Sequence, residues 1–146
     1  MPCPFFLPTH RLDCGAWVRP PRLPLGDPYA GVCHSDPSAP VEPPEAHQRE
    51  LCNCGYARYR CAHFPEDAAA DAVRFSVVED TAGRIELVYV IEKDHAPAEH
   101  GRLVYVQDAD RLEGPHTTGL LARQARAFLE SRASHGFTGD DGAGQA

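Results

Sequence analysis

Apolar and polar residues alternate regularly in the second half of the chain, beginning at residue 72. The alternation is interrupted at 80–83, a turn-forming segment that ends in glycine, and then resumes. Two such runs around a short turn predict a β-hairpin. A third run at 102–107, after a loop at 94–101, extends the prediction to a three-stranded antiparallel β-meander over residues 72–107. One face of this sheet would be apolar and need a cover. The alternating apolar positions are Val73, Phe75 and Val77 in the first run and Ile85, Leu87, Tyr89 and Ile91 in the second.

A helix is predicted over residues 117–133. Thr117 or Thr118 can cap its first turn, and the residues that follow place apolar side chains on one face and charged side chains on the other. This helix is the expected cover for the sheet. Residues 134–146 are rich in glycine and polar residues and are predicted to form a disordered tail. The apolar helix positions are Leu121, Ala125, Phe128 and Leu129, and the charged ones are Arg123, Arg126 and Glu130.

Residues 1–65 show neither the two-residue alternation of a strand nor the 3.6-residue period of a helix. Twelve of the 14 prolines lie in this half, and proline interrupts both helices and sheets. The segment is therefore predicted to be mostly loop and turn, and it would bury too little apolar surface to become ordered without an added crosslink. The predicted fold class is α+β, with a single domain over residues 1–133 in which this irregular half packs beside the meander and one C-terminal helix.

The charge balance and the N-terminus limit the function classes. The chain carries 14 Lys and Arg against 21 Asp and Glu, a net charge of −7, so it lacks the attraction to phosphates that drives nucleic-acid binding. The first residues have neither the positively charged segment nor the apolar run of a signal peptide. No stretch of the chain approaches the roughly 18 apolar residues of a membrane span. We expect a cytoplasmic protein that binds neither nucleic acid nor membrane.

The cysteines are the residues with the clearest chemistry. All six lie within residues 1–65, and in a reducing compartment clustered cysteines more often bind metal or act in catalysis than form disulfides. The candidates are flanked by prolines, glycines and aromatic residues that favour turns and exclude water. Taking one ligand from each cluster makes residues 1–65 a metal-binding region. Its predicted ligands are Cys3, Cys33, Cys52 and Cys61.

Cys54 and Cys14 are the two cysteines that are not chosen as ligands. Cys52 is preferred to Cys54 because Asn53 and Gly55 can form a tight turn that presents backbone amides to the Cys52 sulfur. Two sulfurs at that spacing rarely serve one metal, so Cys54 is kept as a substitute. Cys14 is the weakest ligand candidate, because its neighbours in the sequence give it the least support.

The spacing of the four candidate ligands along the chain helps to distinguish between two kinds of metal centre. Structural zinc sites usually use cysteines two to four residues apart, whereas these ligands are 30, 19 and 9 positions apart. A [4Fe-4S] cluster takes one cysteine per iron, so ligands from dispersed loops suit it better. The predicted cofactor is therefore a [4Fe-4S] cluster, with zinc as the alternative if His34 or His63 assists. A disulfide scaffold and uncomplexed thiols are the remaining interpretations of the same residues.

These observations predict a small metal-binding protein with an electron-transfer, redox-sensing or accessory role and a protein partner. The alternative is a zinc-stabilised protein-binding module without redox activity. The loop around His95 and His100 carries carboxylates that could support acid–base chemistry, and Arg58 and Arg60 could bind an anion. No nucleophile with a base and an orienting partner accompanies them, so no catalytic residue is predicted and enzymatic activity is left open.

Overall fold

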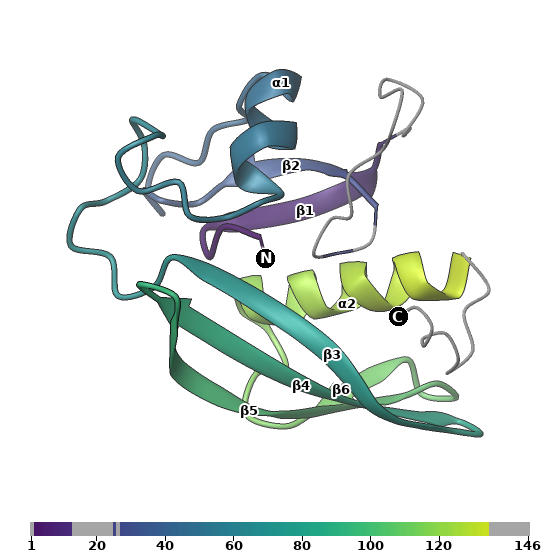
Figure 1. The fold of residues 1–146 in the computed structure, drawn as a ribbon. Helices are drawn as coiled ribbons and strands as arrows, with labels where there is room; N and C mark the ends of the chain where they lie inside the picture. Colours follow the sequence, from purple (N-terminus) through teal and green to yellow (C-terminus); the bar gives the residue numbers. More distant parts are fainter. Residues whose placement is uncertain (1, 13–24, 26, 135–146) are drawn as a thin grey trace.

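The computed structural model describes residues 2–12, 25 and 27–134, which form an α+β fold (Figure 1). Two antiparallel sheets and two α-helices make up this part of the chain, together with one turn of π-helix. The elements in chain order are β1 (Phe6–Arg11), β2 (Tyr29–Cys33), α1 (Glu45–His47), the π-helical turn η2 (Gln48–Cys52), β3 (Ala72–Thr81), β4 (Arg84–Lys93), β5 (Ala96–Val106), β6 (Arg111–Glu113) and α2 (Gly119–Ser134).

The larger sheet contains four strands in the order β3-β4-β5-β6. Its first three strands correspond to the predicted meander, and the three-residue strand β6 adds a fourth that was not predicted. The loop expected at 94–101 is wrong in length, because β5 already begins at Ala96. Asp94 and His95 alone make the turn, with φ of 53° and 64°, the left-handed values that a tight two-residue hairpin turn requires.

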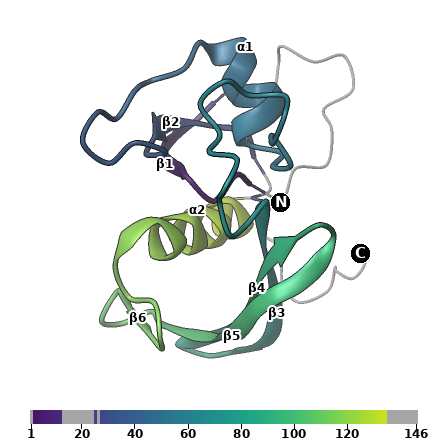
Figure 2. The same cartoon turned by 90° about the vertical axis from the view of Figure 1, so that its left-hand side faces the viewer.

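Helix α2 lies between the two sheets (Figures 1 and 2). On one side it covers the four-stranded sheet, as predicted for residues 117–133, and the Phe75 and Phe128 rings are 5.7 Å apart there. On its other side it meets the hairpin of β1 and β2, where the Tyr29 hydroxyl donates to the Ala127 carbonyl at 2.7 Å. The helix thus joins the two halves of the chain through one continuous core.

The N-terminal half is more regular than predicted. Strands β1 and β2 pair antiparallel, with Phe6 opposite Cys33, and the register shifts between Pro8 and His10. Proline is tolerated in edge strands. Pro8 lies in such a strand, because both strands of a two-stranded sheet are edges. Residues 1–65 were expected to be mostly loop and turn, and the hairpin and the helical segment 45–52 were not foreseen; residues 53–65 contain no strand or helix.

Two predicted features fall outside the part of the chain that can be described. These are Cys14 and, apart from Ser134 at the end of α2, the predicted disordered tail 134–146. None of the helices formed by residues 2–12, 25 and 27–134 has the length and apolarity needed to cross a lipid bilayer.

Candidate metal centre

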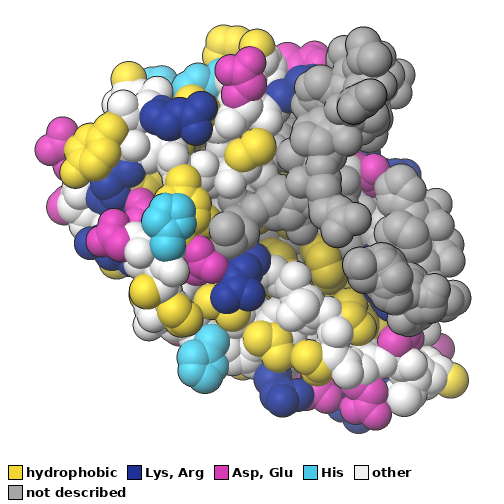
Figure 3. All heavy atoms as spheres, viewed as in Figure 1, with side chains coloured by type: hydrophobic (Ala, Val, Ile, Leu, Met, Phe, Trp, Pro, Cys, Tyr) yellow, Lys and Arg dark blue, Asp and Glu magenta, His cyan; other side chains and the backbone are white. Residues whose placement is uncertain are grey.

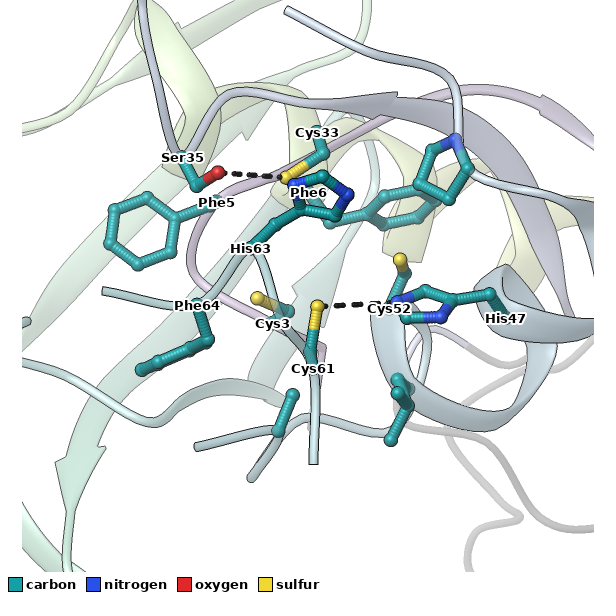
Figure 4. Close-up of a pocket in the computed structure, with 13 residues that line it drawn as sticks. Cys3, Phe5, Phe6, Cys33, Ser35, His47, Cys52, Cys61, His63 and Phe64 are labelled. Carbon is teal, nitrogen blue, oxygen red and sulfur yellow. Dashed lines mark hydrogen bonds between the residues drawn. The ribbon is translucent and has the colours of Figure 1, made fainter. Parts of the chain in front are cut away.

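A pocket lies between the β1–β2 hairpin, the helical turn η2 and the loop after it (Figure 4). It is narrow and partly open to solvent, and its exposed lining is apolar. Every cysteine of the predicted ligand set lines it, and all of them are free thiols. Four positions spread over 59 residues of sequence, from 3 to 61, are thus brought together in space. The lining residues are Cys3, Phe5, Phe6, Cys33, Ser35, Pro43, His47, Leu51, Cys52, Ala57, Cys61, His63 and Phe64.

The hairpin places the first two cysteines. Cys3 lies in the turn before β1, where its carbonyl accepts a hydrogen bond from the Phe6 N–H at 3.1 Å and its own N–H donates to the Cys52 carbonyl at 2.9 Å. Cys33 is the last residue of β2 and exchanges two backbone hydrogen bonds with Val41, at 2.7 and 3.1 Å. Both backbones are therefore fixed by hydrogen bonds, and the two thiols are buried, with 8% and 9% exposure.

The π-helical turn places Cys52. It lies five positions after His47, which would put the two side chains about 140° apart around an α-helix with 3.6 residues per turn. The hydrogen bond from Asn53 N–H to the Gln48 carbonyl spans five residues instead of four, so the turn is wider and both His47 and Cys52 reach the pocket. Such π-turns are rare and often occur at functional sites.

Cys54 does not line the pocket. Its side chain is exposed, and its sulfur lies 3.5 Å from the Arg49 carbonyl. The backbone N–H groups of residues 53–55, expected to point at the Cys52 sulfur, donate instead to the carbonyls of Gln48 and Leu51. The Asn53 side-chain amide donates to the carbonyls of Tyr29 and Gln48. Cys52 thus lines the pocket and Cys54 does not, and the Asn53 side chain contacts β2.

The loop after η2 places Cys61. The Cys61 N–H donates to the Ala57 carbonyl at 2.8 Å, and Arg58 holds the same loop from the other side. Its guanidinium pairs with Asp71 at 2.8 Å and donates to the Ala68 carbonyl at 2.9 Å. Arg58, considered in the sequence as an anion-binding residue, therefore has a structural role that ties the Cys61 loop to the start of the large sheet.

Burial disfavours the charged form of two of the pocket thiols, Cys3 and Cys52. Burial raises the pKa of Cys3 to about 12, and the neighbouring Cys33 and Cys61 sulfurs add to this effect. Burial likewise raises the pKa of Cys52 to about 12, with further contributions from the other three cysteines of the pocket. The mutual effect on the pKa values follows from the proximity of the four sulfurs. A metal that binds thiolates would have to displace these protons.

Two hydrogen-bonding side chains at the sulfurs were not predicted from the sequence. The His47 ring nitrogen Nε2 lies 3.2 Å from the Cys61 sulfur, and the Ser35 hydroxyl lies 3.3 Å from the Cys33 sulfur (Figure 4). Ser35 was detectable as the second residue after a candidate cysteine, whereas His47 is 14 positions from Cys61 and carries no local signal. Of the two histidines considered for zinc, His63 lines the pocket and His34 does not.

A buried set of amide side chains supports the cysteine-bearing segments. Gln124 of α2 donates to the carbonyls of Cys3 and Phe6, both at 2.8 Å, and is completely buried. Gln48 accepts the Gly31 N–H at 2.8 Å. Together with Asn53, these amides connect α2, the hairpin and η2 around the pocket. Such outer partners are what usually fixes the direction of metal ligands.

Comparison with known proteins identifies no relative. No family model, curated protein or solved structure matches the chain. Function resides in sites rather than in folds, so the chemistry of the pocket is the basis for assigning one.

The loop considered for acid–base chemistry does not form a joint site with the pocket. The His95 ring stacks on Tyr56, with the ring centroids 4.2 Å apart, and the His95 backbone N–H donates to the Tyr56 hydroxyl. His100 lies within β5, paired with Val90. Neither histidine lines the cysteine pocket.

Four cysteine side chains at one pocket would offer a metal soft sulfur ligands. Among residues 2–12, 25 and 27–134, no group of three or more His, Cys, Asp or Glu side chains is arranged to hold a metal ion. Cys3, Cys33, Cys52 and Cys61 nevertheless line one pocket. One tetrahedral zinc takes four ligands at about 2.3 Å, whereas a [4Fe-4S] cluster takes one cysteine for each iron.

Proposed function

We propose that the protein binds a [4Fe-4S] cluster through Cys3, Cys33, Cys52 and Cys61, and that it serves in electron transfer, in redox sensing or as an accessory to a larger enzyme. The observation that carries the proposal is the convergence of four free thiols, from four separate segments, on one pocket. A bound cluster supplies one-electron redox chemistry. The number of thiols matches one cysteine for each iron.

The walls of the pocket suit this function. Phe5 and Phe64 pack edge to face with centroids 5.5 Å apart, and Phe6 is almost fully buried. The three rings line the same pocket as the sulfurs, and three of the four cysteines are buried, whereas Cys61 is only partly buried. An electron-transfer site needs such an arrangement, because the centre must be shielded and still approachable by a partner.

A protein partner remains part of the proposal. The face shown in Figure 3 mixes acidic and basic side chains among its described residues and shows no continuous basic patch there. This distribution supports the expectation that the partner is not a nucleic acid. Tyr59, which is 87% exposed on the loop between Ala57 and Cys61, offers the kind of large aromatic contact that protein interfaces favour.

Anaerobic purification followed by iron and sulfide analysis tests the proposal. We expect about four irons and four sulfides per chain, as one cluster requires, and a brown colour that dithionite bleaches. Cys→Ser substitution at each of the four pocket cysteines should reduce the iron content. Cys54→Ser is the matched control, because the Cys54 side chain is exposed outside the pocket, and it should retain full iron.

A zinc-stabilised binding module is the second candidate, because His47 and His63 add nitrogen ligands to the pocket lining. It predicts colourless protein with about one zinc per chain. That result, or iron content unaffected by all four pocket substitutions, would eliminate the cluster.

A further inference from the structure

The four sulfurs of the pocket are not equivalent. Cys3, Cys33 and Cys52 are 7–9% exposed, whereas Cys61 is only partly buried. Cys61 is also the cysteine in contact with His47, whose Nε2 lies 3.2 Å from its sulfur (Figure 4). One corner of the site therefore combines partial exposure with a direct imidazole contact.

The direction of this hydrogen bond follows from the chemistry of the ligand. A thiolate bound to iron has no proton to donate, so the imidazole must be the donor, with its proton on Nε2. A hydrogen bond to a ligating sulfur withdraws negative charge from the centre, which stabilises the more negative, reduced state. Its removal should therefore lower the reduction potential.

We propose that His47 is a positioning residue that donates its Nε2 proton to the Cys61 thiolate and thereby raises the reduction potential of the bound centre. The inference rests on the proposed function and deepens it. The π-helical turn is part of this device, because it brings His47 and Cys52 to the same pocket although they are five positions apart.

Other groups near the sulfurs provide internal comparisons. The Ser35 hydroxyl is 3.3 Å from the Cys33 sulfur and can turn to donate once that sulfur is ionised. The backbone at Phe5 makes a hydrogen bond to the Cys3 sulfur. His63 lines the same pocket, and no hydrogen bond joins it to a sulfur of any described cysteine. His63 is thus a histidine with a similar location and without the proposed contact.

The test is a redox titration of the iron-loaded wild-type protein and of three variants. The visible absorption spectrum of each protein monitors its titration. His47→Leu removes the donor and should lower the potential. His47→Gln places an amide N–H at a similar distance along the side chain and should restore most of the wild-type value. His63→Leu is the matched control and should leave the potential unchanged. Equal potentials in wild type and His47→Leu, or equal shifts in His47→Leu and His63→Leu, would overturn the inference.

A separate comparison covers the case in which His47→Leu cannot retain iron. His47→Gln and His47→Asn are both polar, but the Asn amide is too short to occupy the Nε2 position. A lower potential in His47→Asn than in His47→Gln supports the inference, and identical potentials contradict it. Wild-type protein that binds no iron would instead refute the proposed function, so the two failures are distinguishable by metal analysis.

Discussion

Arg58 and Asp71 form an ion pair whose side chains are only 11% and 3% exposed. Removal of one partner leaves the other charge buried and uncompensated, which typically costs about 3–5 kcal/mol. We therefore expect Asp71→Asn to lower the free energy of unfolding by an amount in that range, measured by denaturant titration. The control is Glu113→Gln, which breaks an exposed pair with Arg111 and should cost less than about 1 kcal/mol. Similar losses in both variants would show that the Arg58 pair has no special structural role.

Glu92 makes the stability of the fold sensitive to acid. The hydrogen bond from the Tyr56 hydroxyl and the ion pair with Arg74 at 2.6 Å together hold the pKa of Glu92 below its usual value, although burial opposes them. A lowered pKa in the folded state stabilises the protein above the unfolded-state pKa of about 4.3, and this contribution is lost as the pH falls through the lower folded value.

The melting temperature should therefore drop steeply as the pH is reduced from about 4.3 into the range where folded Glu92 is protonated. Glu92→Gln cannot ionise, so its melting temperature should be lower at neutral pH and should decline less on acidification. Thermal unfolding followed by circular dichroism between neutral and acid pH measures both curves. Parallel curves for the two proteins would mean that Glu92 does not contribute to the acid response.

At the scale of elements, the β1–β2 hairpin depends on Gly31. A methyl group added at this residue would stand 2.0 Å from the Leu7 carbonyl oxygen and 2.9 Å from Pro8 Cα, both backbone atoms that cannot move aside alone. Overpacking of a fixed site costs about 1–3 kcal/mol, and here the strand pairing itself would have to open. Gly31→Ala should therefore destabilise the protein by at least about 2 kcal/mol in denaturant titration.

Gly83 provides the matched control for this substitution. Its φ is +82°, and a methyl group added there would meet nothing within 4 Å. Gly83→Ala should cost only the roughly 1–2 kcal/mol of left-handed backbone strain. A loss at Gly31 no larger than the loss at Gly83 would contradict the close-contact argument.

The elements with a clear period were predictable from the sequence. Alternation defined the strands within 72–107 and a 3.6-residue period defined α2, because both elements bury one face and expose the other. The hairpin of β1 and β2 was missed because Pro8 and the register shift after it interrupt alternation. Strand β6 has only three residues, which is too short for any period to be detected.

The cysteine pocket could be predicted only in part for a related reason. Thiols are recognisable by residue type, so Cys3, Cys33, Cys52 and Cys61 could be selected from turn chemistry alone, and they do converge on one pocket. His47 reaches the pocket through a π-helical turn, which no periodicity indicates. The support from Gln124 depends on α2 packing 121 residues away from Cys3. Contacts of that range follow from the tertiary fold and not from any local pattern.

At the scale of the whole molecule, the two sheets differ in the interactions that stabilise them. The large sheet has a continuous apolar face that packs against α2, with Leu87 and Leu103 fully buried. Among its described residues, the cysteine-bearing half has one short hairpin and the helical segment 45–52, and the loop 53–71 that carries Cys61 contains no strand or helix. Under the proposed function the centre crosslinks these segments, so its removal should affect the two halves unequally.

Hydrogen exchange after iron removal by a chelator under reducing conditions tests this inequality. Amides of β1, β2, η2 and the Cys61 loop should exchange about 10-fold faster or more, equivalent to at least about 1.4 kcal/mol of lost local stability. Amides of β3, β4 and β5 should change much less, because their hydrogen bonds lie within a sheet whose own apolar face is covered. Cys54→Ser protein, treated in parallel, should behave like the wild type before and after chelation. Uniform acceleration across both halves would indicate one cooperative unit, and no change anywhere would mean that the four thiols do not depend on a metal for their arrangement.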